Sequence, residues 1–298
     1  MNGSRFRFGE VEAKSADTLI ELALAEDLGQ VGDITAAATI PSHAQGKARF
    51  VARAAGVLAG ILVVERLIAR FQHLTRWQLH RTDGGRLERN AVIAEIAGPV
   101  RSILTLERTA LNFLQRLSGI ATLTARFVAA VQGTSARILD TRKTTPGWRA
   151  LEKYAVRCGG GGNHRMGLYD AVLIKDNHLA WLERHEEGDT IAVAVATARA
   201  YTPQGMVVEV EVDSLDQLDR ALACRPDIIL IDNLGPEGVA EAVRRRNAVA
   251  SEIALEASGG VNLDTVAALA RTGVDRISVG ALTHSAPALD IALDLDVS

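Results

Sequence analysis

Positively charged side chains are concentrated in the stretch from Arg142 to Lys175. This stretch holds four arginines and three lysines against two acids, Glu152 and Asp170, which gives a local charge of +5 in a chain whose net charge is −3. We expect Arg142, Lys143 and Lys175 to lie at strand ends, where guanidinium forks and ammonium groups can bind carboxylates or phosphates. The sequence therefore predicts a local site for a small, highly anionic substrate.

Three other cations in the same stretch have a different spacing. Arg149, Lys153 and Arg157 recur every four residues, and side chains at that spacing lie on one face of a helix. We interpret these three residues as a solvated cationic helix face.

A glycine run interrupts the cationic stretch. Residues 159–162 are all glycine, and they lie between Cys158 and the sequence Asn163-His164-Arg165. Ordering four glycines costs much chain entropy, so the run is either a flexible loop or a loop whose bare backbone must approach a ligand closely. Because a histidine and an arginine follow at once, we favour the second interpretation and expect His164 and Arg165 to line the site.

Two carboxylates further along the chain are candidate metal ligands. Glu211 and Asp232 each lie at or beside the end of an apolar segment. A buried acid or a helix cap is the alternative for such positions, and it suits Asp213 or Asn233. In a site that binds phosphate, two inward carboxylates would hold Mg²⁺, which bridges protein carboxylates and phosphate oxygens.

Glycine also follows the last two apolar segments of the chain. Backbone N–H groups without side-chain obstruction, followed by a helix N-terminus, favour anion binding, and the last two strands of an α/β barrel are a common phosphate site. The residues concerned are Ser258, Gly259 and Gly260 after one segment, and Val279, Gly280 and Ala281 after the next.

The elements that position these residues alternate in type from residue 137 onward. Short aliphatic segments typical of buried strands are separated by helical segments, which predicts parallel strands joined by crossovers. The expected strands are 137–140, 171–174, 207–212, 227–231, 253–257 and 276–279, and the expected helices include 215–223, 238–246 and 263–272. Polar residues follow nearly every strand. That arrangement favours a TIM-like (β/α) barrel, in which such residues converge at one rim.

The first third of the chain has another pattern. Residues 17–28 have helical spacing after a possible cap at Asp17, and 48–51, 57–62 and 92–96 resemble strands, with a sharp turn at Asp83-Gly84-Gly85. A long helical stretch begins near Leu104, and we place a domain boundary near Ser118. We therefore expect an α+β domain over residues 1–117 and a barrel domain over 118–285.

The bulk composition excludes several classes of protein. Hydrophobic residues make up 48% of the chain, but aromatic residues only 4%, which predicts a folded protein with an aliphatic core. A net charge of −3 provides no basic field for nucleic acid, and no apolar run is long enough to cross a membrane. The N-terminus, residues 1–10, lacks a signal-peptide pattern, and Cys158 and Cys224 lack metal spacing. We expect a cytoplasmic protein with free thiols.

Several longer motifs resemble the quinolinate phosphoribosyltransferase family. The resemblance covers residues 17–292 in order and spacing, with small departures at Trp148 and in the charged segment 183–189. The motifs are ILDTRKTTPG (138–147), AVRCGGG (155–161), NHR (163–165), EDLG (26–29), GDIT (32–35), GVLAG (56–60), ERTALN (107–112), LIKDNH (173–178) and EVEVD (209–213).

The resemblance implies a reaction and an architecture. The family converts quinolinate and phosphoribosyl pyrophosphate into nicotinate mononucleotide, pyrophosphate and CO₂ with Mg²⁺, in NAD biosynthesis. It implies an N-terminal open α/β sandwich joined by the C-terminal tail 286–298, together with a TIM-like barrel. It further implies a homodimer with shared active sites, and leaves open whether dimers assemble further.

The resemblance also implies roles for the matching residues. Arg108 from the partner subunit would hold the quinolinate carboxylates together with Arg142, His164 and Arg165, close to Thr141. Lys143 and Lys175 would lie at the junction of the two substrates and act in catalysis with Glu211 and Asp232, which would serve the ribose hydroxyls and the metal. The 5′-phosphate would be bound by Ser258, Gly259, Gly260, Val279, Gly280 and Ala281.

Three other functions stay open at this point. A relative with the same fold could act on a different acidic acceptor, including relatives associated with molybdenum transport. Lys175, at a strand end, could form a Schiff base as in an aldolase-type lyase. A catalytically silent nucleotide-binding regulator is the third alternative.

Overall fold

The computed structural model describes residues 7–71 and 73–296, and the chain forms two compact units. The first comprises the chain up to Ala125, Thr144–Gly161 and the segment from Leu282 onward, and the second comprises Arg126–Lys143 and Gly162–Ala281. The boundary expected near Ser118 lies within one helix, α4 (Val100–Ala130). Residues 1–6 of the N-terminus, for which no signal-peptide pattern was expected, lie outside the described residues.

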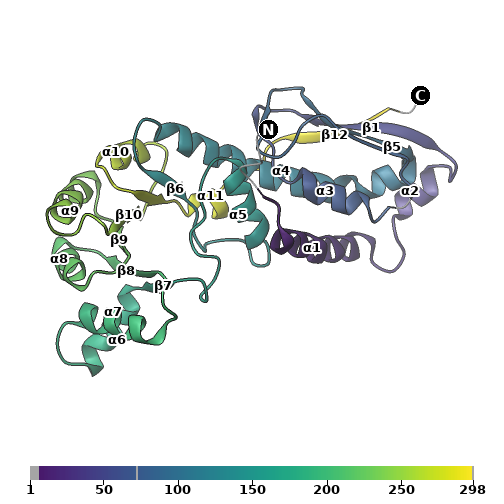
Figure 1. Cartoon of the computed structure of the whole chain (residues 1–298). Helices are drawn as coiled ribbons and strands as arrows, with labels where there is room; N and C mark the ends of the chain where they lie inside the picture. The colour runs from purple at the N-terminus through teal and green to yellow at the C-terminus, as the bar shows by residue number, and fades with distance from the viewer. Residues whose placement is uncertain (1–6, 72, 297–298) are drawn as a thin grey trace. The chain divides into compact units, whose positions relative to one another are not determined.

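The first unit contains a four-stranded antiparallel sheet. Its order is β12 (Ile291–Asp296), β1 (Gln45–Ala52), β5 (Val92–Pro99) and β3 (Arg76–Leu79). The last strand of the chain thus returns to the first unit and pairs with β1 along its length, from Lys47 opposite Asp296 to Ala52 opposite Ile291 (Figure 1).

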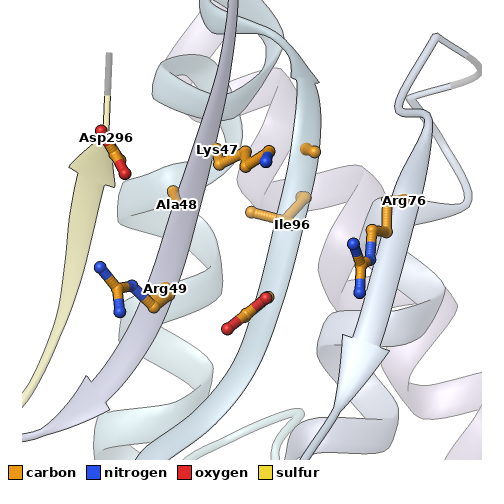
Figure 2. Close-up of a pocket in the computed structure, with 8 residues that line it drawn as sticks. Lys47, Ala48, Arg49, Arg76, Ile96 and Asp296 are labelled. Atoms are coloured by element: carbon orange, nitrogen blue, oxygen red, sulfur yellow. The ribbon is translucent and has the colours of Figure 1, made fainter. Parts of the chain in front are cut away.

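One face of this sheet is buried and the other is open. Along β1, Ala48 and Phe50 are buried, whereas Lys47 and Arg49 are exposed, as the alternation of a half-buried strand requires. The open face carries a hollow of about 230 Å³, with Lys47 and Arg49 on β1, Arg76 on β3 and Asp296 on β12 (Figure 2). None of the residues predicted for the site lies in this hollow.

Helices form the rest of the first unit. The longer helices are α1 (Glu10–Leu28), α3 (Ile61–Ile68), α4 and α5 (Arg149–Cys158), and the shorter ones are α2 (Ile34–Thr39) and α11 (Ala281–His284). A separate pair of short strands is formed by β2 (Gly56–Val57) and β4 (Arg86–Leu87). The core is largely aliphatic, as expected, and Cys158 and Cys224 are free. Among the described residues, no helix is both long and apolar enough to cross a bilayer.

Two local predictions in this unit are wrong. Of the expected strand 57–62, only Val57 is a strand residue, at the end of β2. The strand stops there because Gly60 adopts φ 99° and α3 begins at Ile61, whose N–H donates to Asp83 Oδ1 at 3.0 Å. Asp17 is not a cap, because α1 already begins at Glu10, where the Gly9 N–H donates to Glu12 at 2.9 Å. Asp17 instead binds Arg66 on α3, with Nε 2.9 Å from Oδ1.

The solvated cationic helix face is also wrong. Lys153 on α5 is fully buried, and so are its neighbours Glu152 and Tyr154. Arg157 is 2.7 Å from Glu12 and its side chain is only 26% exposed. Four-residue spacing identified the helix correctly, but it could not reveal that α5 is buried on nearly all sides.

The second unit is a TIM-like (β/α) barrel built on six parallel strands. The strand order is β6-β11-β10-β9-β8-β7 (Figure 1). The strands are β6 (Arg137–Leu139), β7 (Val172–Ile174), β8 (Val208–Val212), β9 (Ile228–Asp232), β10 (Ala254–Ser258) and β11 (Arg276–Ser278). Each predicted strand is confirmed to within one residue at either end.

Helices α6 (Asp176–His185), α7 (Thr190–Tyr201), α8 (Leu215–Cys224), α9 (Pro236–Val249) and α10 (Val266–Arg271) connect these strands. Each crossover returns the chain in the same direction, so the carboxyl ends of all six strands lie at one rim. Helix α8 is capped by Ser214, whose hydroxyl accepts the Gln217 N–H. The cap residue of this helix is therefore Ser214 and not Asp213.

The end of the glycine run continues the sheet beyond β6. Gly162 forms a parallel bridge with Leu139, its N–H donates to Ile138 O at 2.8 Å, and its carbonyl accepts the Asp140 N–H at 3.2 Å. A Cβ at Gly162 would lie 2.7 Å from the Leu139 side chain, and one at Gly159 would lie 2.3 Å from Ala121 O. Packing against the protein therefore explains these two glycines without a ligand.

Candidate active site

A cavity of about 400 Å³ lies at the carboxyl ends of the barrel strands. It is lined by Thr141, Arg142, Lys143, His164, Arg165, Leu173, Lys175, Glu211, Leu230, Asp232, Ser258 and Ser278. Most of the residues predicted for the site are therefore brought together from β6, β7, β8, β9 and β10 and from the segment after the glycine run. The common hollow that the charge pattern predicted is present.

A close ion pair spans two neighbouring strands of this cavity. Lys175 directly follows β7, and its Nζ atom lies 2.6 Å from Oε2 of Glu211 on β8. The lysine side chain is 45% exposed and the glutamate 13%, so the ammonium group faces the cavity while the carboxylate is more enclosed. An imine-forming lysine needs an uncharged nitrogen, and this contact offers no support for such a role.

A fully buried carboxylate fixes the segment that carries His164. Asp140, at the end of β6, accepts the His164 N–H at 2.9 Å and the Asn163 side-chain amide at 2.6 Å. The side chain of His164 is 8% exposed. The segment is thus anchored to the sheet edge rather than flexible.

A charged cluster lies in the barrel interior beside His164. The His164 Nε2 atom is 3.1 Å from Glu209 Oε2 and 3.5 Å from Glu256 Oε1, and Arg276 Nε is 2.8 Å from Glu256 Oε2. Burial opposes the charged form of His164, but the hydrogen bond to Glu209 and the charge of Glu256 outweigh it, so the pKa of His164 is raised. Burial and the charge of Glu209 raise the pKa of Glu256.

The three side chains His164, Glu209 and Glu256 could also be considered a metal site, because their ligand atoms lie within 4.8 Å of one another. Arg276 already supplies a positive charge 2.8 Å from Glu256. The positive charge of Arg276 and the hydrogen bond from the His164 ring to Glu209 partly compensate the two carboxylates without a metal ion. Ion pairing is the simpler account of this cluster.

Arg165 is held at two points. Its backbone N–H donates to His164 Nδ1 at 2.7 Å, and its Nη1 donates to the Ala171 carbonyl at 3.0 Å. Burial and the nearby charge of Arg142 lower the pKa of the Arg165 guanidinium. Two guanidinium groups in one cavity repel each other, and an anion bound between them would relieve that repulsion.

Asp232 is oriented by the residue that follows it. Asn233 has φ 59°, and its side-chain amide donates to Asp232 Oδ2 at 2.7 Å while its backbone N–H donates to Ser258 O at 3.0 Å. Gly259, at φ 92°, lies so close that an added Cβ would be 2.2 Å from Asn233 Oδ1. These contacts link the end of β9 to the loop after β10.

The predicted phosphate-binding residues are only partly in the cavity. Ser258 lines it, whereas Gly259 and Gly260 line an adjoining hollow of about 200 Å³ with Asn233 and the start of α9. Val279 is buried and donates its N–H to Leu139 O at 2.9 Å, and Gly280 and Ala281 follow at the start of α11. At the end of β11 it is Ser278 that reaches the cavity. The phosphate role of these residues stays a prediction.

Glu211 and Asp232 fit the expected metal. Both line the same cavity and both offer hard oxygen donors, which is the ligand type that Mg²⁺ prefers. Glu211 also pairs with Lys175, and Asp232 accepts a hydrogen bond from the Asn233 side chain, so each carboxylate has a polar neighbour. The donor set is suitable for an ion that keeps most of its water and binds phosphate oxygens.

Arg108 lies elsewhere in the chain. It is an exposed residue of α4 in the first unit. Its expected role, to complete the site of a second copy, stays a prediction.

The interior residues Glu209, Glu256 and Arg276 were not predicted as parts of the site. The signal for Glu209 was present, because residues 209 and 211 are two apart in a strand and must point to the same face. A glutamate at position 256, inside an otherwise apolar strand, is a second signal, since a charge in a buried strand needs a partner.

The fold and the cavity define a class of protein: an α/β barrel whose rim gathers cations and carboxylates for small anionic substrates. Two family models match the chain, the N-terminal domain of quinolinate phosphoribosyl transferase over residues 33–118 and its C-terminal domain over residues 120–294. The chain belongs to the quinolinate phosphoribosyltransferase family.

Individual relatives agree with this membership. A Mycobacterium leprae protein named nicotinate-nucleotide pyrophosphorylase [carboxylating] is 44% identical over 290 residues, covering 96% of this chain and 99% of the relative. A Bacillus subtilis protein with the same name, marked probable, is 41% identical and covers 92% of this chain and 91% of its own length. The structure of the Francisella tularensis nicotinate-nucleotide pyrophosphorylase has a TM-score of 0.87 at 40% identity, covering 95% of this chain and 96% of the other.

Proposed function

We propose that this chain catalyses phosphoribosyl transfer from phosphoribosyl pyrophosphate to quinolinate, with decarboxylation to nicotinate mononucleotide, as a step of NAD biosynthesis. The observation that carries the proposal is a single cavity at the barrel rim that joins Arg142, Arg165 and Lys175 to Glu211 and Asp232. The names of the relatives support the same reaction.

The cations of the cavity can offset the repulsion between the two substrates of this reaction. Quinolinate carries two carboxylates, and its partner substrate carries phosphate and pyrophosphate groups, so the two substrates repel each other. At about 4 Å and an effective dielectric constant near 20, each pair of like charges costs about 4 kcal/mol. Cations on the cavity wall, among them Arg142, Lys143, Arg165 and Lys175, offset that cost and bring the two reactants together.

The bond changes then need little from protein nucleophiles. The C1–O bond of the ribose breaks, its electron pair leaves with pyrophosphate, and the ring nitrogen of quinolinate forms the new N–C1 bond. The ring nitrogen is now positively charged, so it stabilises the electron pair that stays on C2 when the bond from C2 to its carboxylate breaks and CO₂ leaves. C2 then takes a proton from water, which forms its C–H bond.

Within this proposal, Arg142 and Arg165 bind the quinolinate carboxylates, and Lys143 and Lys175 lie where the two substrates meet. Glu211 and Asp232 would bind the ribose hydroxyls and hold Mg²⁺, whose contribution when bound is to neutralise pyrophosphate charge. The loops after β10 and β11 would take the 5′-phosphate.

The proposal includes a second copy of the chain. Arg108 of one subunit would reach the quinolinate carboxylates in the other subunit's cavity, which makes the active unit a homodimer with shared sites. We propose a cytoplasmic location and no membrane or nucleic-acid partner, in keeping with the net charge of −3.

The direct test is to incubate the purified protein with quinolinate, phosphoribosyl pyrophosphate and Mg²⁺ and to measure CO₂ and nicotinate mononucleotide. Both products should form in equal amounts and should disappear when a chelator removes Mg²⁺. Nicotinate, which lacks the 2-carboxylate, serves as the control acceptor. Turnover of nicotinate without quinolinate turnover, or no product from either acceptor, would refute the proposal.

A further inference from the structure

His164 connects the barrel interior to the backbone of Arg165. On one side its Nε2 atom is 3.1 Å from Glu209 Oε2, and on the other its Nδ1 atom accepts the Arg165 N–H at 2.7 Å. A carboxylate on β8 is thereby linked through one imidazole ring to the residue proposed to bind the substrate carboxylate.

These contacts define how the ring is protonated in this arrangement. An N–H group donates to Nδ1, so Nδ1 must present its lone pair, and the ring proton lies on Nε2. That proton points at Glu209, with Glu256 3.5 Å away. A direct hydrogen bond from His164 to a substrate carboxylate would require the ring to give up one of these two contacts.

The interior carboxylates are well placed to hold the ring still. Glu209 is 1% exposed and Glu256 is completely buried, and both lie on strands of the parallel sheet. Arg276, on β11, offsets part of their charge through its 2.8 Å contact with Glu256. Glu209 Oε1 is buried and has no hydrogen-bond partner among the described residues, which is costly for stability. A cost of this kind is tolerated where a residue serves the function of the site.

We propose that Glu209 is a positioning residue for the substrate carboxylate, acting through His164 on the backbone of Arg165. In this assignment, His164 contributes to quinolinate binding by fixing Arg165 and is not itself the ligand, which revises the role that the family resemblance implied. The inference rests on the proposed function for the identity of the ligand.

A double-mutant cycle tests the assignment, with quinolinate affinity measured directly by calorimetry and the affinity for phosphoribosyl pyrophosphate measured in parallel. Glu209→Leu should weaken quinolinate binding on the order of tenfold and leave phosphoribosyl pyrophosphate binding unchanged. Glu209→Gln, whose amide oxygen still accepts from Nε2, should stay within about threefold of the parent chain. In an Arg165→Ala background, Glu209→Leu should add less than about twofold.

The matched control is Glu252→Gln, which neutralises a carboxylate that is 59% exposed just before β10, and it should change neither affinity. If Glu209→Leu fails to fold in a thermal melt, His164→Asn and His164→Ala replace it. Asn keeps an acceptor near the position of Nδ1, so His164→Asn should bind quinolinate several-fold more tightly than His164→Ala.

Each result has one meaning. The positioning role would be overturned if the effects of Glu209→Leu and Arg165→Ala on quinolinate affinity were independent and multiplied. It would also be overturned if Glu209→Leu weakened the binding of both substrates equally. Equal quinolinate affinities of His164→Asn and His164→Ala would overturn it as well. If the parent chain binds no quinolinate at all, the proposed function itself fails, and that outcome is seen before any variant is compared.

Discussion

The Nζ atom of Lys175 lies 2.6 Å from Oε2 of Glu211, across two adjacent parallel strands. This contact joins one cation of the cavity wall to one of the two carboxylates that fit a metal. A substrate that brings its own negative charge and metal into the cavity would compete for both groups. In the proposed reaction, the two substrates would meet at this pair.

Replacing Lys175 with Met should remove activity without unfolding the protein. A cation that stabilises charge developing in the transition state is worth on the order of 100-fold in kcat, so kcat/KM should fall by at least that factor. Because the lysine side chain is 45% exposed, the ion pair itself contributes little to stability. Steady-state kinetics and a thermal melt check both expectations, and retention of more than about a tenth of the parent activity would contradict the role.

Arg142 and Arg165 should matter for the geometry of their guanidinium groups as well as for charge. Lys keeps the charge but cannot form the paired hydrogen bonds of a guanidinium with a carboxylate. Arg142→Lys and Arg165→Lys should therefore raise the KM for quinolinate on the order of tenfold or more, while the KM for phosphoribosyl pyrophosphate changes little. Equal increases for both substrates would mean that these residues do not select the dicarboxylate.

Gly259 and Gly260 offer a matched pair of substitutions. Both have positive φ, at 92° and 58°, but a Cβ on Gly259 would meet Asn233 Oδ1 at 2.2 Å and Asn233 N at 2.8 Å, whereas nothing lies within 4 Å of one on Gly260. Gly260→Ala should cost about 1 kcal/mol of stability from backbone strain. Gly259→Ala should cost about 1–3 kcal/mol and should also lower activity, because Asn233 orients Asp232. Urea unfolding and kinetics on both variants separate the two effects, and identical behaviour of the pair would contradict this account.

The barrel was predictable from the sequence because its signals are local. Each strand is a short aliphatic run, and each run ends in polar residues whose side chains the parallel topology brings to one rim. Lys175 and Glu211 could therefore be placed near each other without coordinates. The resemblance to a family then supplied roles that spacing alone cannot supply.

The errors came from features that depend on tertiary contacts. Helical spacing gave Lys153 a solvated face, but α5 is buried, and no pattern within one helix records what surrounds it. Residues 57–62 have the composition of a strand, yet Gly60 and the contact between Ile61 and Asp83 set the start of a helix there. Both outcomes depend on contacts with residues distant in the sequence, and such tertiary contacts override the local preference for helix or strand.

The pair between Asp17 and Arg66 should give the first unit a defined acid sensitivity. The hydrogen bond from Arg66 holds the pKa of Asp17 below its ordinary value of 3.8. A carboxylate with a lowered pKa in the folded state contributes stability that is fully present above the ordinary value and is lost as the pH falls through the lower folded value. The stability difference between the parent chain and Asp17→Asn should therefore be constant at neutral pH and shrink below about pH 3.8.

Urea midpoints at pH 7, 4 and 3 measure that difference, and the other carboxylates cancel because both chains share them. Glu21→Gln is the control, since Glu21 pairs with Arg70 at 3.0 Å but is 66% exposed, and it should change the midpoints little. A difference between the parent chain and Asp17→Asn that grows toward low pH would have the wrong sign for this pair.

Mixing two inactive variants tests whether active sites are shared between subunits. Arg108→Ala would damage the site of the partner subunit, and Lys175→Ala would damage the subunit's own cavity, so each homodimer should be inactive. In a dimer with one copy of each, both defects fall in the same site and the other site is intact. Random reassortment makes half of the dimers mixed, each with one of two sites working, so about a quarter of the parent activity should return. Activity should be measured after partial unfolding and refolding of the mixture, with each variant refolded alone as the control. Recovery no greater than the sum of the separate variants would show that Arg108 serves its own subunit or has no part in binding quinolinate.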